Sequence, residues 1–387
     1  MAVAPRDLTS ATSIADELRA LAQLAQLWAA VQAVGDRAGV EGIYVVGGTV
    51  RDLLLGAPSV DVDVAVEGDG IAFARALARE LGGSMRRHDV FGTAVVAWGD
   101  GERLDVVTAR SEVYETPGAL PAVQPAAIRD DLFRRDFTIN AIAGSLRARD
   151  FGTLLDPFGG LRDLATGAVR VLHGLSFTDD PTRLFRAVRY ESRYGFRLDG
   201  SSERLARACV EAGLIQELSG ARLREELVAI LEDAHPGRSI LRLGELGAAA
   251  AIHPALAADD GTVALLGRLQ ALAAELVPGE VPAWRLGLAA LARRLGPDEA
   301  RALAGRLALR RRDADALAVT AVAAPRLARA LRGGTGLPAS EIVALVGGAP
   351  LDAVLIALAL EEAPPLRAYL QRHRAVRLQV TGADLAA

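Results

Sequence analysis

The sequence predicts an α+β protein, in which a domain built on a mixed β-sheet precedes a long all-helical region. Residues 43–67 combine an apolar run, a glycine pair, a short helical pattern and a second alternating run, which is typical of strand, turn, helix and strand. Three further strand candidates follow at 84–88, 93–98 and 103–108, separated by turn residues. From about residue 200 onward the pattern is helical throughout.

The composition limits the class of protein before any motif is considered. With 387 residues, 51% of them hydrophobic and 24% charged, the chain is long enough for two or more soluble domains. It has no apolar run long enough to cross a bilayer and no secretory signal pattern, so we expect a cytoplasmic protein without a membrane partner. The single cysteine, Cys209, is interpreted as a small buried hydrophobe. Because the net charge is −4, any RNA contact has to come from local clusters of arginine.

A glycine pair and two aspartates indicate nucleotide chemistry. Gly47 and Gly48 let backbone N–H groups approach a polyphosphate at a helix start, and Arg51, one turn further on, can hold a phosphate oxygen. In the following strand, Asp61 and Asp63 point to one face because strand side chains alternate. Two adjacent carboxylates repel unless a cation lies between them, so this pattern predicts a magnesium site; a solvated strand face is the alternative.

The same stretch resembles the signature of the nucleotidyltransferase superfamily. The resemblance is to the class II tRNA nucleotidyltransferases and bacterial poly(A) polymerases, which have GG-x-VRD-x-LLG followed by D-x-D. The match here is GGTVRDLLLG at 47–56 and DVD at 61–63. This resemblance implies a polymerase-β-like head domain followed by an all-helical neck, body and tail.

The resemblance also implies roles for individual residues. Gly48 and Arg51 would hold the triphosphate, while Asp61 and Asp63 would be catalytic and bind two Mg²⁺ ions. Asp105, which alternates with apolar neighbours on another predicted strand, would be the third catalytic carboxylate. A surface acid on an exposed strand face is the alternative interpretation of Asp105.

A second segment, DLFRRDFTINA at 131–141, is similar to the family's DL-x-RRDFTINA motif. By resemblance Arg135 reaches the nucleotide, while Asp136 and Asn140 fix the junction between strand and helix. Adjacent arginines on a helix cannot both face one partner, so Arg134 is interpreted as a solvent-facing side chain.

Two further segments are interpreted as connections. Residues 108–128 contain three prolines, so we expect no regular element there; they resemble the family's flexible loop. Residues 156–164, DPFGGLRDL, are similar to the family's DP-x-GG-x-xDL segment, which leaves the catalytic domain. The junction between head and neck is therefore expected near 150–170.

Residues 179–190, DDPTRLFRAVRY, are interpreted as a helix that starts at Pro181. Arg183, Arg186 and Arg189 recur every three residues and are expected to share one broad face. A solvated arginine face is the alternative.

Asp180 lies one turn before Arg183, so the two side chains can present an acceptor and a bidentate donor that match the edge of a base. The segment resembles the family's ED-x-xR motif, with Asp179 in place of Glu. The resemblance implies that Asp180 and Arg183 select CTP or ATP, and that Arg186 and Arg189 contact the nucleotide.

We therefore expect an N-terminal helix at 1–40, a head domain at 41–160, a neck at 161–235 and a body and tail at 236–387. In the family the helical part binds the acceptor and TΨC arms of tRNA by shape and phosphate contact. The candidate RNA-contacting residues are Arg222, Arg224, Arg242, Arg310, Arg311 and Arg312.

The function that the resemblance implies is addition of CCA to the 3′ end of tRNA, without a nucleic-acid template, from CTP and ATP with Mg²⁺. One alternative keeps the fold: an enzyme that adds only the terminal A, or a poly(A) polymerase, since the shared motifs serve the shared chemistry. The other alternative is a non-catalytic RNA- or nucleotide-binding relative. Intact Asp61 and Asp63 argue against it, because a protein that only binds needs no paired metal carboxylates. The sequence does not specify an oligomeric state.

Overall fold

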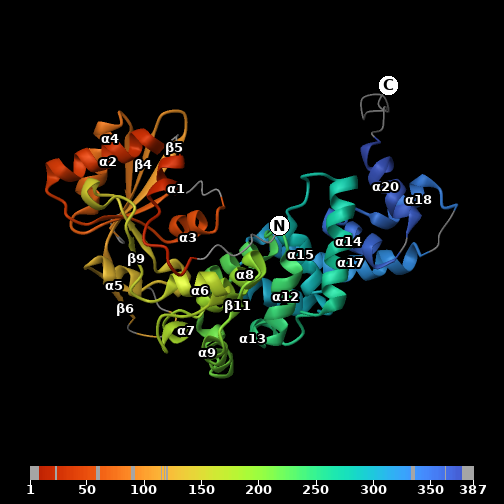
Figure 1. Ribbon diagram of the computed structural model, residues 1–387. Helices are drawn as coiled ribbons and strands as arrows, with labels where there is room; N and C mark the ends of the chain where they lie inside the picture. Colours follow the sequence, from red (N-terminus) through yellow and green to blue (C-terminus); the bar gives the residue numbers. More distant parts are fainter. Residues whose placement is uncertain are drawn as a thin grey trace. The chain divides into compact units, whose positions relative to one another are not determined.

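The computed structural model describes residues 8–21, 24–57, 62–88, 92–114, 116, 118, 121–332, 336–361 and 363–376. The chain divides into two compact units, Met1–Cys209 (unit 1) and Val210–Ala387 (unit 2) (Figure 1). The predicted finer division at 40, 160 and 235 stays a prediction.

Unit 1 is built on a seven-stranded mixed sheet with the strand order β3-β4-β5-β2-β1-β8-β9. Only β2 and β5 pair in parallel; the other neighbouring strands in this sheet are antiparallel. The strand candidates at 84–88, 93–98 and 103–108 are confirmed to within one residue at each end, whereas the second strand of the 43–67 stretch is described as a strand only from Asp63. The strands are β1 (Ile43–Val46), β2 (Asp63–Val66), β3 (Ser84–His88), β4 (Thr93–Trp98), β5 (Glu102–Thr108), β8 (Ala143–Ser145) and β9 (Leu154–Leu155).

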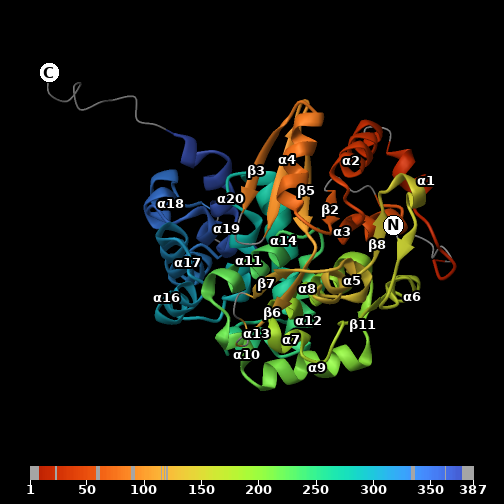
Figure 2. The same ribbon diagram turned by 90° about the vertical axis from the view of Figure 1, so that its left-hand side faces the viewer.

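The helices of unit 1 pack against the sheet. One of them, α5, contains the start of the second motif, residues 131–141. Helix α4 packs on β4 and β5 (Figures 1 and 2). Its Phe73 and Leu77 are buried in the core. A short parallel ladder of β10 (Ala168–Val169) and β11 (Arg197–Leu198) packs beside α8. The helices are α1 (Ala15–Ala20), α2 (Ala25–Ala38), α3 (Gly48–Leu54), α4 (Gly70–Glu80), α5 (Ile128–Phe133), α6 (Gly160–Thr166), α7 (Ser176–Asp179), α8 (Thr182–Tyr194) and α9 (Gly200–Glu211), with the 3₁₀ turn η3 (Thr138–Asn140).

The predicted single N-terminal helix is wrong, because α1 ends at Ala20 and α2 begins at Ala25. Trp28 Nε1 donates a hydrogen bond to the carbonyl of Leu18 (3.1 Å), so α2 folds back on the last turn of α1. This contact satisfies a carbonyl that the end of α1 leaves without a helical donor. The Leu18 and Trp28 side chains are both buried.

The expectation that 108–128 holds no regular element is also wrong. Strands β6 (Arg110–Val113) and β7 (Ala122–Pro125) form an antiparallel pair. The prolines permit it because Pro121 precedes β7 and Pro125 is its last residue, so neither removes a donor from the middle of the strand.

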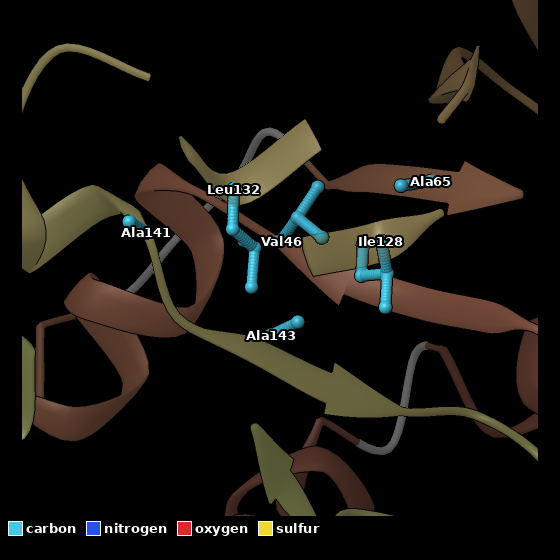
Figure 3. Close-up of a cluster of buried hydrophobic side chains, with 6 residues drawn as sticks. All are labelled: Val46, Ala65, Ile128, Leu132, Ala141 and Ala143. Atoms are coloured by element: carbon cyan, nitrogen blue, oxygen red, sulfur yellow. The ribbon is translucent and has the colours of Figure 1, made fainter. Parts of the chain in front are cut away.

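A cluster of small and branched apolar side chains fixes α5 and the residues after it against the sheet. Figure 3 shows that these side chains come from β1, β2, α5 and the segment around β8. Because they pack closely, the segment 134–140, which lies between α5 and β8, is held next to the end of β1. The cluster consists of Val46, Ala65, Ile128, Leu132, Ala141 and Ala143.

Every regular element in the described part of unit 2 is helical, as predicted. No single described helix is long and apolar enough to span a membrane, although the bent pair α18–α19 passes the same test of length and composition. The helices are α10 (Leu214–Glu217), α11 (Gly220–Leu231), α12 (Pro236–Glu245), α13 (Ala248–Ile252), α14 (Asp260–Leu276), α15 (Ala283–Leu291), α16 (Pro297–Arg306), α17 (Arg311–Ala330), α18 (Ala339–Val346), α19 (Leu351–Leu360) and α20 (Pro364–Gln371), followed by the 3₁₀ turn η5 (His373–Ala375).

Cys209 is buried in α9, and its Sγ donates a weak hydrogen bond to the carbonyl of Phe177 (3.4 Å). Burial raises the pKa of this thiol to about 12. The interpretation as a small buried hydrophobe is confirmed.

Candidate active site

A cavity of about 430 Å³ lies within unit 1 where the end of β1, the segment after α5 and the start of α8 meet. Five arginines and four carboxylates line it. The sequence-predicted site residues that it brings together are Gly48, Arg51, Asp63, Arg135, Asp180, Arg183 and Arg186. Asp105 and Arg189 are not in its wall, and Asp61 lies outside the described residues.

The glycine turn makes one wall, and it requires glycine for two reasons. Gly47 has φ +71° and ψ −132°, a conformation that other residues avoid. A Cβ at this position would also lie 2.6 Å from Arg135 Nη1 and 3.8 Å from Asp63 Oδ2. Because that space is open, the Arg135 guanidinium and the Asp63 carboxylate both approach the turn that opens α3.

Asp63 and Asp105 are neighbours in register on the parallel strands β2 and β5. Adjacent strands are about 4.8 Å apart, so the two carboxylates project side by side from one face. Hard oxygen ligands at this spacing fit a divalent cation such as Mg²⁺. Within the described part of the chain, which does not include Asp61, no three His, Cys, Asp or Glu residues cluster as a metal site.

Asp131, completely buried on α5, holds both arginines of the RRDF motif. Arg134 Nη2 lies 2.8 Å from Asp131 Oδ1, and Arg135 Nη2 lies 3.0 Å from Oδ2. Burial alone would raise the pKa of Asp131, but Arg135 and Arg134 outweigh it and hold the pKa below its usual value.

Both predictions about Arg134 are therefore wrong. Helix α5 ends at Phe133, so both arginines lie after the helix and the angular spacing of helical residues does not apply to them. Both side chains therefore reach Asp131. The Arg134 side chain is only 17% exposed, because it also pairs with Glu112 on β6 (2.9 Å).

Asp136 ties the RRDF segment to α8. Its Oδ2 accepts from Arg186 Nε and Nη2 (2.8 and 2.7 Å), and its Oδ1 accepts from Asn140 Nδ2 (2.8 Å) and from the Phe137 N–H (2.9 Å). Burial alone would raise the pKa of Asp136, but Arg186 and Asn140 hold it below its usual value.

Arg51 is almost completely buried, with a side chain only 6% exposed. Its Nε and Nη2 donate to Asp52 (2.9 and 3.0 Å), and its Nη1 donates to Asn140 Oδ1 (2.7 Å). Its guanidinium also lies over the rings of Tyr190 and Tyr194, 5.2 and 4.8 Å from their centroids. Although Arg51 lines the cavity, each of its three nitrogens already donates to a protein group.

Asp180 and Arg183 lie close together in the chain at the start of α8, and Arg183 is only 4% exposed. Asp180 Oδ1 accepts from the N–H and hydroxyl of Thr182 (3.0 and 2.6 Å). Arg183 donates to Ser176 Oγ (2.6 Å) and to the carbonyl of Arg134 (2.8 Å). Both side chains are thus fixed in the cavity wall.

The expectation that Arg183, Arg186 and Arg189 share one face is wrong for Arg189. Each residue of an α-helix turns by about 100°, so two steps of three residues turn Arg189 by about 120° away from Arg183. Tyr190, four residues after Arg186, lines the cavity in its place.

Sequence reasoning missed Glu112, Tyr114, Tyr190 and Tyr194, and it gave Asp131 no role. Glu112 accepts from Arg110, Arg134 and Tyr114 and so joins β6 to the cavity wall. The spacing of Arg186, Tyr190 and Tyr194, four residues apart, was a usable signal. No sequence signal pointed to Glu112, because Arg134, the partner that joins it to the segment after α5, is twenty-two residues away in the chain.

A mixed sheet that presents a glycine turn beside carboxylates on parallel neighbouring strands defines a nucleotidyltransferase head domain. The family description "Poly A polymerase head domain" matches residues 43–170, and "Probable RNA and SrmB- binding site of polymerase A" matches residues 195–260. The chain belongs to the family of class II tRNA nucleotidyltransferases and bacterial poly(A) polymerases.

Curated relatives of the chain differ in the nucleotide that their names specify. An A-adding tRNA nucleotidyltransferase of Geobacter sulfurreducens is 50% identical over 224 residues, 58% of this chain and 26% of that protein. One of Halalkalibacterium halodurans is 40% identical over 242 residues, 62% of this chain and 55% of that protein. A CC-adding tRNA nucleotidyltransferase of Geobacter sulfurreducens is 35% identical over 248 residues, 62% of this chain and 52% of that protein. The chain thus spans from about a quarter to just over half of these relatives.

Solved structures match over nearly the whole chain. A CCA-adding enzyme in its apo form II has a TM-score of 0.87 and 34% identity, and the match covers 96% of this chain and 89% of that one. The Thermotoga maritima CCA-adding enzyme complexed with tRNA has a TM-score of 0.80 and 34% identity, with 97% and 89% covered.

Proposed function

We propose that the chain is a tRNA nucleotidyltransferase that transfers a nucleotide from a nucleoside triphosphate to the 3′ end of tRNA. One observation carries the proposal: a single cavity contains the glycine turn, the Asp63 carboxylate and the Asp180–Arg183 pair. This arrangement supports triphosphate binding, metal binding and base selection around one nucleotide.

In this proposal the end of β1 holds the triphosphate. The backbone N–H groups at the start of α3 face the phosphates, and Arg135 adds a positive charge beside Gly47. Asp131 keeps the Arg135 guanidinium in place through one nitrogen, while Arg135 Nε has no hydrogen-bond partner among the described residues. A donor that is buried without a partner is available to a phosphate oxygen.

Asp61, Asp63 and Asp105 would hold Mg²⁺, which would activate the RNA 3′ hydroxyl and neutralise charge on the departing pyrophosphate. The chain supports this by projecting Asp63 and Asp105 from adjacent strands in register. The N–H of Asp63 donates to Thr49 Oγ1 (3.2 Å), which fixes the start of β2 against α3.

Base selection falls to Asp180 and Arg183. Their hydrogen bonds within the protein restrict each side chain to one rotamer, so a base is read by groups that lose little entropy on binding. Arg186 adds a charge to the same wall. We assign Arg189 no direct contact with the nucleotide in the cavity.

The tRNA would be bound mainly by the helical part. In this proposal residues 41–160 form the head, 161–235 the neck that reads the base, and 236–387 the tRNA-binding body and tail. Among the predicted RNA-contacting residues, Arg224 donates to the carbonyl of Ala308 and Arg242 pairs with Glu245. Arg311 is 96% exposed at the start of α17 and is the best placed of these three for a phosphate.

The identities favour addition of the terminal A over the full CCA sequence that the motifs suggested. Within one organism, Geobacter sulfurreducens, the A-adding relative is 50% identical and the CC-adding relative 35% identical. Both alignments cover more than half of this chain. We therefore propose ATP as the substrate and a tRNA that ends in CC as the acceptor.

The test is nucleotide incorporation, with Mg²⁺, into three tRNA transcripts that end before CCA, after C and after CC. Each is offered CTP alone, ATP alone, or both. Extension of only the CC-ended transcript, and only by ATP, supports the proposal. Extension of all three to CCA would establish the full CCA enzyme, and long A tails on any RNA would establish a poly(A) polymerase.

A control separates catalysis from binding. Asp61→Ala removes a proposed metal ligand, so incorporation should disappear while the protein stays folded. Unchanged incorporation would overturn the two-metal interpretation. An inactive parent protein that still binds tRNA and ATP would identify a non-catalytic relative.

A further inference from the structure

Three residues on one stripe of α8 fasten this helix to the head. Arg186, Tyr190 and Tyr194 are four residues apart, so they lie one above the other on the helix. All three contact α3 or the 136–140 segment, and α3 and α8 lie side by side in both views (Figures 1 and 2).

Arg51 lies at the centre of these contacts. Its guanidinium donates to Asp52 and Asn140 and covers the rings of Tyr190 and Tyr194. Burial raises the pKa of the Tyr194 hydroxyl to about 12, so this hydroxyl stays protonated and donates to Asp52 Oδ1 (3.1 Å). Arg51, Asp52 and Tyr194 therefore hold one another.

Asn140 extends the connection to the arginine that lines the cavity. It accepts from Arg51 through Oδ1 and donates to Asp136 through Nδ2, and Asp136 in turn accepts from Arg186. The Tyr190 hydroxyl accepts from both Asn140 and Arg186 (3.1 and 3.2 Å). The hydrogen bonds thus run without interruption from α3 to α8.

We propose that Arg51 is a positioning residue, which holds α8 at a fixed place relative to the glycine turn. It would not be a phosphate ligand. The inference rests on the proposed function, because its consequence is that Asp180 and Arg183 sit at a set distance from the triphosphate. Asp52, Asn140 and the two tyrosine rings hold the Arg51 guanidinium in one orientation, so its remaining N–H groups could turn toward a phosphate only by giving up these contacts.

The two roles predict different results for Arg51→Lys. A lysine keeps the positive charge and binds phosphate as a point charge, but it cannot bond Asp52 bidentately while it bonds Asn140. If Arg51 positions α8, Arg51→Lys should behave like Arg51→Met. Both should lower kcat for ATP addition and raise the ratio of CTP to ATP incorporation by about tenfold or more.

Tyr194→Leu tests the inference without touching the nucleotide. Tyr194 is absent from the cavity wall, so its loss changes base selection only by releasing Arg51 and α8. The expected result is a rise in the CTP to ATP ratio in the direction seen for Arg51→Lys, with KM for ATP changed less than threefold. Arg147→Met removes another mostly buried arginine, which pairs with Asp36 and is absent from the cavity wall, and should keep the parent ratio.

Double substitution supplies a second readout. Because Arg51 and Tyr194 contact each other, the effects of Arg51→Met and Tyr194→Leu on the ratio should be less than multiplicative.

The proposal is overturned if Arg51→Lys retains parent kcat and selectivity while Arg51→Met raises KM for ATP by about thirtyfold, a change of about 2 kcal/mol. It is also overturned if Tyr194→Leu leaves selectivity unchanged in an active parent background. A parent protein that extends no tRNA would overturn the proposed function itself, and this inference with it.

Discussion

Buried charges are distributed unequally between the two units. In the described part of unit 1, five charged residues are almost fully buried, and four of them belong to the cavity or its support: Arg51, Asp131, Asp136 and Arg183. In the described part of unit 2 the one such residue is Asp352. Burying a charge costs several kcal/mol unless it is paired, so a concentration of paired buried charges indicates a site kept for function. Unit 2 is instead stabilised by apolar packing between helices.

The cavities of the two units differ in the same way. Unit 2 has a cavity of about 370 Å³ whose wall includes Arg285, Arg312 and Asp352. There Arg285 is held by Asp352 (3.1 and 2.6 Å), and the wall includes Gly348 but no carboxylate from a described strand. Arginines and a glycine therefore do not distinguish the sites; the carboxylates on neighbouring strands do.

The largest effect should come from Asp63→Asn in unit 1. The substitution keeps the size of the side chain but removes the charge that would hold Mg²⁺. We expect ATP incorporation to fall by about 10³-fold or more, which is about 4 kcal/mol of transition-state stabilisation. Single-turnover incorporation checks this, with circular dichroism as the folding control. Near-parent activity would remove Asp63 from the chemistry.

In unit 2, Leu303→Ala should change stability without changing catalysis. Leu303 is completely buried where α16 packs on α17, so truncation leaves a cavity. We expect the free energy of unfolding to fall by about 2–5 kcal/mol. Urea unfolding measures this change, and incorporation per folded molecule should equal that of the parent. A loss of activity in fully folded protein would show that packing in unit 2 also affects catalysis, against the contrast drawn between the two units.

The pH dependence of stability should also distinguish the units. The folded-state pKa values of Asp131 and Asp136 lie below the usual 3.8, so their contribution is complete above pH 3.8 and is lost as pH falls through the folded values. Asp131→Asn should cost about 1–3 kcal/mol at pH 7 and flatten the acid limb of the stability curve.

Asp298→Asn in unit 2 is the matched control. Asp298 is 95% exposed and pairs with Arg301 on the surface, so its loss should cost at most about 1 kcal/mol. Urea unfolding of both variants between pH 3 and pH 7 makes the comparison. If the free energy of unfolding of Asp131→Asn decreases with falling pH as steeply as that of the parent, Asp131 is not a source of the acid sensitivity.

The smallest effect should come from Arg311→Ala. This side chain is 96% exposed, so the free energy of unfolding should change by no more than about 0.5 kcal/mol. If Arg311 contacts a tRNA phosphate, the slope of log K against log salt should decrease by about one. Binding titrations at several salt concentrations measure the slope, and an unchanged slope would remove Arg311 from the RNA interface.

The sequence predicted the elements that depend on local pattern. Alternation and turn residues located β3, β4 and β5, and the motif spacing placed Gly48, Asp63 and Asp180 in one site. These features succeed because strand period and turn chemistry are set by neighbouring residues.

The errors concern contacts between distant segments. Arg134 reaches Glu112, twenty-two residues away, and no local pattern identifies that partner. The break between α1 and α2 depends on where the Trp28 side chain finds an acceptor. The proposed positioning role of Arg51 also depends on such a contact, because Tyr194 is 143 residues away along the chain. The error at Arg189 is local, because a repeat of three was assumed, whereas the helix has a repeat of 3.6.

Titration of the protein with ATP tests most directly whether unit 1 contains the nucleotide site. The parent protein is compared with Arg135→Met in the unit 1 cavity and Arg312→Met in the unit 2 cavity. We expect Arg135→Met to weaken ATP binding at least about tenfold, which is about 1.4 kcal/mol, and Arg312→Met to bind ATP as the parent does. Loss of ATP binding in Arg312→Met, with parent affinity in Arg135→Met, would contradict the account.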